Sequence, residues 1–229
     1  MKKKLVISTG AGISAESGIS TFRDSGGLWE KYPVMEICSA DGFRRNPALV
    51  HNFYNERRKD LLEAQPNKAH IGLVELEKDF DVYVITQNVD DLHERAGSKN
   101  ITHLHGELMK VRALDDESKV YKLSAEACET SPETIIDGHH VRPHIVFFQE
   151  AVPNMEKAVE LVEKADIFVV IGTSLNVYPA AGLLHYVKKG APVFYIDPNP
   201  APVPDWVTVI KATASEGVEI LAKKLQELK

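Results

Sequence analysis

Short, almost wholly apolar runs alternate with longer amphipathic stretches along the chain. The runs lack polar alternation, as expected of strands buried on both faces of a sheet; they are residues 4–8, 82–86, 167–171 and 193–197. The amphipathic stretches have the spacing of helices that cover such a sheet; they are residues 48–63, 68–78, 154–164, 180–188 and 215–228. This order predicts the α/β class, with a Rossmann-like parallel sheet and helices on both faces.

Two regions interrupt this alternation. Residues 24–65 are rich in helical pattern where a compact doubly wound fold would place its second strand. Residues 111–142 are polar and have no strong period. We therefore expect one catalytic domain over residues 1–229, in which a helical module (24–65) and a reduced small module (111–142) are inserted into the Rossmann-like core.

Composition and charge narrow the class of protein. With 229 residues, 44% of them hydrophobic, the chain can form one domain with an insertion. Its 27 basic and 33 acidic residues give a net charge of −6, which argues against nucleic acid or an anionic membrane as partner. The longest apolar run is far shorter than the roughly 20 residues of a spanning helix, and nothing resembles a signal peptide. We expect a cytoplasmic protein.

A glycine-rich segment follows the first predicted strand. Gly10, Gly12 and Ala15 have the G-x-G-x-x-G/A spacing of a turn that lets a pyrophosphate approach the backbone at the start of a helix. The alternative is that these glycines serve only a tight turn. A dehydrogenase would also need a second strand ending in an acidic residue about 20 positions further on. Residues 26–33 form no such strand, so a dehydrogenase is disfavoured.

Polar side chains follow the other predicted strands. Gln87, Asn88 and Asp90 come after one strand, Thr173 and Ser174 after the next, and Asp197 ends a further one. Open parallel sheets bind ligands at the carboxyl ends of their strands, so we expect these groups to converge. Single clusters of this kind also occur as helix caps.

Together these segments resemble the sirtuins, a family of NAD-dependent protein-lysine deacylases. The matching blocks are GAGIS at residues 10–14, SGI at 17–19, TFR at 21–23, GLW at 27–29, TQNVD at 86–90, HLHGEL at 103–108, RPHIVFF at 142–148 and GTSL at 172–175. The resemblance implies that an acyl-lysine oxygen attacks C1′ of the nicotinamide ribose of NAD. Nicotinamide leaves, and the products are free lysine and O-acyl-ADP-ribose.

The resemblance also implies roles for individual residues. His105 would be the catalytic base, which suits an imidazole near neutral pH, whereas we expect His103 to be structural or solvent-facing. An extended substrate peptide would pair with the segment Val146, Phe147 and Phe148. The cofactor would be bound by Gly10, Ala11, Gly12, Glu16, Phe22, Arg23, Trp29, Gln87, Asn88, Asp90, Gly172, Thr173, Ser174, Asp197, Pro198, Asn199 and Ala214.

Tyr54 and Arg57 indicate which acyl group the protein would remove. Three residues apart in a predicted helix, they share one face, where a phenol and a guanidinium can bind a carboxylate together. The pair resembles that of sirtuins that remove succinyl, malonyl and glutaryl groups, and acetyl is expected as an additional substrate. Alternatively, Arg57 lies on a solvated helix face whose charges pair within the helix, as Glu56 or Asp60 would allow.

The sequence departs from most sirtuins in three places. Only Cys128 lies between residues 106 and 141, where the family usually has four zinc-binding cysteines, so we expect no zinc and no metal ligand. With Cys38 as the one other cysteine, two unpaired thiols are favoured over a single bridge. Gln149 stands where the family usually has glycine, and Asp197 where many members have asparagine.

ADP-ribosyl transfer, NAD hydrolysis and a non-catalytic NAD-binding module remain alternatives to the deacylase activity.

Overall fold

The computed structural model describes residues 2–21 and 33–228. Its larger part is a parallel sheet in the order β10-β9-β8-β1-β2-β3. The strands are β1 (Lys4–Thr9), β2 (Asp81–Thr86), β3 (Ile101–His103), β8 (Ile167–Ile171), β9 (Val193–Ile196) and β10 (Val207–Ile210). The chain winds outward in both directions from β1 and β8, which are paired, so the predicted Rossmann-like α/β class is confirmed.

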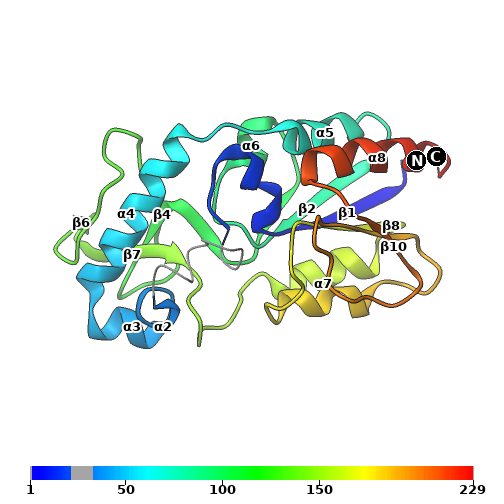
Figure 1. The fold of residues 1–229 in the computed structure, drawn as a ribbon. Helices are drawn as coiled ribbons and strands as arrows, with labels where there is room; N and C mark the ends of the chain where they lie inside the picture. Colours follow the sequence, from blue (N-terminus) through cyan, green and yellow to red (C-terminus); the bar gives the residue numbers. More distant parts are fainter. Residues whose placement is uncertain (1, 22–32, 229) are drawn as a thin grey trace.

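Helices cover both faces of this sheet (Figure 1). On one face α5 (Lys68–Leu76) and α8 (Ala214–Gln226) lie side by side and bury residues such as Leu73 and Leu221 against β1 and β8. On the other face α7 (Met155–Glu163) and η3 (Ala180–Tyr186) pack on Phe168 and Tyr195. The segment 180–188 was expected as an ordinary helix, but it forms a 3-10 helix after Pro179.

A second, antiparallel sheet lies at the other end of the molecule. Its order is β5-β4-β7-β6, and the strands are β4 (Gly106–Ala113), β5 (Val120–Lys122), β6 (Ile135–Ile136) and β7 (His139–Ile145). The polar region at 111–142, for which no regular element was predicted, therefore contains strands. Two of them are only two or three residues long and largely exposed, so they carry almost no periodic signal.

Three helices pack beside this sheet, on the left of Figure 1. They are α2 (Val34–Ile37), α3 (Ala40–Arg45) and α4 (Pro47–Glu63). The Asn46 side chain caps α4 by accepting from the Leu49 amide, and Pro47 occupies the first turn, where its missing N–H costs nothing. Residues from α4, β4 and β7 share one apolar cluster that includes Phe53, Tyr54 and Phe147.

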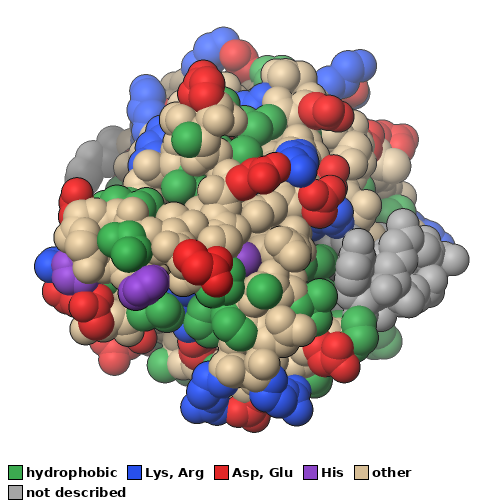
Figure 2. Space-filling view, turned by 90° about the vertical axis from the view of Figure 1, so that its left-hand side faces the viewer, with side chains coloured by type: hydrophobic (Ala, Val, Ile, Leu, Met, Phe, Trp, Pro, Cys, Tyr) green, Lys and Arg blue, Asp and Glu red, His purple; other side chains and the backbone are tan. Residues whose placement is uncertain are grey.

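Cys38 and Cys128 are both free thiols. On the face of the second sheet and its helices, acidic and basic side chains are interspersed (Figure 2). Within residues 2–21 and 33–228, no helix combines the length and apolar character that crossing a bilayer requires.

Candidate active site

A cleft of about 500 Å³ lies where the carboxyl ends of β1, β2 and β8 face α4. Every described residue that the sequence assigned to cofactor, catalysis or substrate lines this cleft. Phe22, Arg23 and Trp29 lie outside the described residues. The convergence expected from the polar strand ends is thus observed: Gln87, Thr173 and Asp197 border the same space.

The glycine-rich loop packs directly on the loop after β8. The Gly12 amide donates to the Gly172 carbonyl oxygen at 2.8 Å, and a Cβ at Gly10 or Gly12 would collide with the backbone of Gly172. Gly172 itself has φ +62°, which favours glycine. These glycines therefore join two loops, in addition to leaving the backbone accessible to a ligand. Instead of the expected helix, two 3-10 turns follow, η1 (Ala11–Ile13) and η2 (Ala15–Ser17).

Ser14 is a site residue whose place in the GAGIS motif did not indicate a role of its own. Its hydroxyl donates to Asp90 Oδ2 at 2.9 Å and accepts from Asn88 Nδ2 at 3.1 Å, and all three side chains are buried. Burial raises the pKa of Asp90, although hydrogen bonds from the Leu92 amide and Ser14 act in the opposite direction. The glycine-rich loop and the end of β2 are thereby held together at one end of the cleft.

The other end of the cleft is bordered by Glu16 and the residues after β9. Glu16 accepts from the Ser215 amide at 2.8 Å and from the Thr213 hydroxyl, so it supports the start of α8. Asp197 accepts from the Asn199 amide at 2.8 Å. Pro198, Asn199 and Ala214 line the same end. Amides, carboxylates and close backbone thus line one cleft, and these are the groups that bind the phosphates and riboses of dinucleotides.

His105 lies in the turn between β3 and β4. Its Nδ1 is 3.1 Å from the Gln87 carbonyl oxygen, which can only accept, so Nδ1 carries the hydrogen and Nε2 has the lone pair. Burial lowers the pKa of His105, against the smaller effect of this hydrogen bond. The imidazole is therefore neutral at pH 7 and oriented as a proton acceptor at the cleft wall.

Tyr54 and Arg57 both project from α4 into the cleft. The Tyr54 hydroxyl donates to Cys38 Sγ at 3.6 Å, and burial raises the pKa of the phenol, so it stays protonated. Arg57 forms an ion pair with Asp60 at 3.0 Å, as expected of a residue on a solvated helix face. Its guanidinium also lies over the Phe53 ring. Its Nε is buried and donates to no group among the described residues.

Val146, Phe147 and Phe148 line the cleft just beyond β7, but their backbone groups are largely engaged. The Val146 amide donates to the His105 carbonyl oxygen, and the amide and carbonyl of Phe148 are paired with Cys38 and Ala40. Phe147 is buried, and its ring lies 4.0 Å from the Arg142 guanidinium. The pairing of a substrate peptide with this segment stays a prediction.

The histidines near Cys128 do not gather into a metal site. His139 pairs with Asp115 at 2.8 Å, and His140 Nδ1 donates to the Pro132 carbonyl oxygen at 3.1 Å. Over the residues that the structure describes, the one group of three potential ligands is Glu94, His103 and Glu107, on the other side of the His105 turn. Their positions in the sequence did not indicate that Glu94 lies close to His103 and Glu107.

The cleft, its histidine and its glycine-rich loop occur together in a known family. The model of the Sir2 family matches residues 10–179 of the chain. The chain belongs to the Sir2 family. This confirms the resemblance to sirtuins on which the residue assignments rest.

Individual Sir2 relatives agree over almost the whole chain. An NAD-dependent protein deacylase of Bacteroides thetaiotaomicron is 58% identical over 229 residues, which cover 97% of this chain and 98% of the relative. A solved Sir2 homologue mutant in complex with ADP-ribose has a TM-score of 0.91 and 38% identity, covering 99% of this chain and 93% of that one. A Sir2 homologue with NAD has a TM-score of 0.86 at 38% identity, covering 99% and 91%.

Proposed function

We propose that this Sir2 protein removes succinyl and malonyl groups, and also acetyl groups, from protein lysines with consumption of NAD. The products are nicotinamide, O-acyl-ADP-ribose and free lysine. The observation that carries the acyl preference is that Arg57 lines the same cleft as His105, while its buried Nε has no acceptor among the described residues. A carboxylate at the end of the acyl chain would supply that acceptor.

NAD supplies an electrophilic carbon at C1′ of its nicotinamide ribose. The protein's part is to bind, orient and accept a proton. A pyrophosphate would approach the backbone where Gly10, Gly12 and Gly172 lack side chains, and Asp197 and Glu16 would face the ribose hydroxyls. NAD-bound structures of the family and deacylase relatives over the full chain support this assignment.

Ser14, Asn88 and Asp90 would hold the nicotinamide end. They form a buried polar group beside Gln87, whose carbonyl oxygen fixes the His105 imidazole. An amide needs both a donor and an acceptor, and this group offers both. His105 Nε2 would then accept the proton of a ribose hydroxyl, which makes that oxygen a nucleophile toward the acyl group.

The acyl-lysine would enter between the helical module and β7. Phe53, Tyr54 and Phe147 would supply apolar walls for the methylene chain, and the Tyr54 phenol, which burial keeps protonated, would turn its hydrogen from Cys38 Sγ to the acyl carboxylate. Acetyl would fit the same channel without using Arg57. The acyl-lysine would belong to a protein segment that binds in extended form along the rim of the cleft.

Mass spectrometry of one peptide that carries succinyl-, malonyl- or acetyl-lysine tests the proposal. With NAD, we expect loss of each acyl group and formation of the matching O-acyl-ADP-ribose. Without NAD, or with His105→Ala, we expect no product. Consumption of NAD without any deacylated peptide would reject the proposal in favour of NAD hydrolysis or ADP-ribosyl transfer. Binding of NAD without turnover would indicate a binding module.

A further inference from the structure

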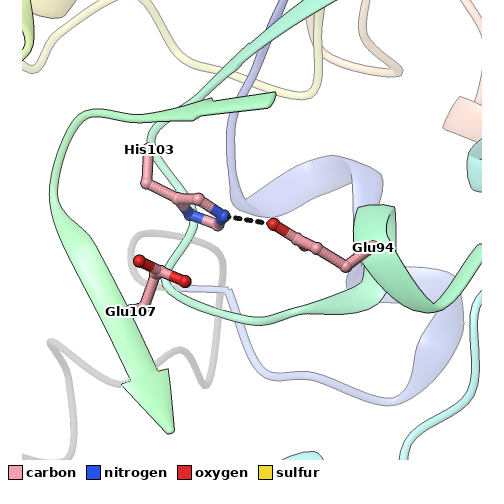
Figure 3. Close-up of side chains that lie close together, drawn as sticks. All are labelled: Glu94, His103 and Glu107. Carbon is pink, nitrogen blue, oxygen red and sulfur yellow. Dashed lines mark hydrogen bonds and ion pairs between the residues drawn. The ribbon is translucent and has the colours of Figure 1, made fainter. Parts of the chain in front are cut away.

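Three potential metal ligands meet beside the His105 turn (Figure 3). Glu94 belongs to α6 (Leu92–Ala96), His103 ends β3, and Glu107 is the second residue of β4. One ligand atom of each residue lies within 4.8 Å of the other two. Ligands of a single zinc-sized ion lie about 3–4 Å apart, so small side-chain rotations would complete the set.

His103 is oriented as metal-binding histidines are. Its side chain is 10% exposed, and Nδ1 is 3.1 Å from the carbonyl oxygen of Asn88. Because that carbonyl can only accept, Nδ1 carries a hydrogen, and Nε2 faces the carboxylates, at 2.7 Å from Glu94. A ring N–H held by a backbone carbonyl is the usual support of a metal-ligating imidazole. His103 is thus not a solvent-facing residue.

With His103 neutral, the three side chains carry a negative charge that a cation can offset. Two carboxylates and a neutral imidazole carry a charge of about −2 by their ordinary ionisation. The Lys110 ammonium is 2.7 Å from Glu107 Oε2 and offsets part of it. A metal ligand must be deprotonated. A metal ion would therefore take the position of the proton that lies between His103 and Glu94.

We propose that Glu94, His103 and Glu107 bind one divalent transition-metal ion of the zinc type. One imidazole and two carboxylates suit Zn²⁺, whereas Mg²⁺ and Ca²⁺ prefer sites built of oxygen alone. Three protein ligands leave a fourth position for water, as the partial exposure of Glu94 permits. This site lies apart from the region where most sirtuins hold zinc, and its ligands were not predicted from the sequence.

The ion would act on the turn that carries the candidate base. His105 lies between His103 and Glu107, and His103 is held by the backbone of Asn88 in the adjacent pocket. A bond from each side of the turn to one ion restricts the motion of residues 104–106. The inference does not depend on the proposed deacylase activity, because binding and backbone motion are measured without substrate.

Calorimetric titration of ZnCl₂ into the full chain, freed of metal with a chelator and then dialysed, tests the site. We expect one equivalent to bind. Glu94→Gln and Glu107→Gln, which keep the shape of each side chain, are expected to weaken binding at least tenfold. Lys110→Met is expected to tighten it several-fold by removing the competing cation. His139→Asn, at the other histidine–carboxylate pair, is the matched control and is expected to bind as the wild type does.

Amide hydrogen exchange supplies a second readout. Zn²⁺ is expected to slow exchange of residues 104–107 in the wild type but not in Glu107→Gln. Unchanged melting temperatures without metal would show that the variants fold. The proposal is overturned if one equivalent of Zn²⁺ does not bind, if both glutamine variants bind as tightly as the wild type, or if His139→Asn abolishes binding.

Discussion

The guanidinium of Arg58 donates from Nε to the carbonyl oxygen of Leu108 at 2.8 Å, which ties α4 to the centre of β4. The same buried group reaches the Cys128 carbonyl oxygen, Asn55 and Thr130. It thereby connects the long segment between β5 and β6 to the helical module. Burial lowers the pKa of Arg58 to about 10, so it remains charged at pH 7. A buried cation thus stabilises the region where most sirtuins are expected to hold zinc.

Arg58→Met is expected to destabilise the protein by about 3 kcal/mol, because the carbonyl oxygens of Leu108 and Cys128 lose their donors inside the protein. Urea unfolding of wild type and variant measures the difference. Arg57→Met, one position earlier, is the control and is expected to cost less than about 1 kcal/mol, because its ion pair with Asp60 is partly exposed. Equal losses in both variants would contradict the role of Arg58.

Gln149 has a left-handed backbone conformation that favours glycine. Its φ is +79°, and its amide group both donates to Asp41 Oδ2 and accepts from the Asp41 backbone amide. We expect Gln149→Gly to be more stable than Gln149→Ala by about 1 kcal/mol, because both lose these bonds but only alanine keeps the strain. Thermal unfolding of the two variants decides this; greater stability of the alanine variant would disprove it.

The pair of Arg142 and Glu150 should give a stability that depends on pH. Burial alone would raise the pKa of Glu150, but hydrogen bonds from Arg142 and the Phe147 amide outweigh it, and the pKa is lowered. A carboxyl whose pKa is lowered by folding stabilises the protein above its ordinary pKa, and that contribution is lost as the pH falls.

Glu150→Gln is accordingly expected to cost about 2 kcal/mol at pH 7. The difference between wild type and variant should shrink below about pH 4.5, where the carboxyl of the unfolded chain becomes protonated. Unfolding in urea between pH 7 and pH 4 measures both chains under the same conditions. A difference that stays constant over this range would show that the charge of Glu150 does not stabilise the fold.

The parallel sheet and most of the cleft could be predicted because their signals are local. Apolar strands such as Ile167–Ile171 end directly in the polar residues that line the cleft, and topology brings those ends together. The family resemblance supplied the role of His105, which a lone histidine in a turn would not have suggested.

What escaped prediction depends on contacts between distant segments. Arg58 follows Arg57 in the sequence, and only the packing of α4 on β4 buries one and leaves the other at the cleft. Ser14 gains its role from Asp90, 76 positions away. Glu94 approaches His103 only because α6 and β3 are adjacent in space, and strands as short as β6 have no period to detect.

Arg57 and Tyr54 are expected to recognise a carboxyl-bearing acyl group in the sirtuin cleft. The most direct measurement is the ratio of kcat/KM for a succinyl-lysine peptide to that for the same acetyl-lysine peptide, in wild type, Arg57→Met and Tyr54→Phe. Loss of a charged hydrogen bond is expected to lower the ratio roughly 10- to 100-fold in Arg57→Met, and less in Tyr54→Phe, with the acetyl reaction nearly unchanged. An unchanged ratio in both variants would contradict the account.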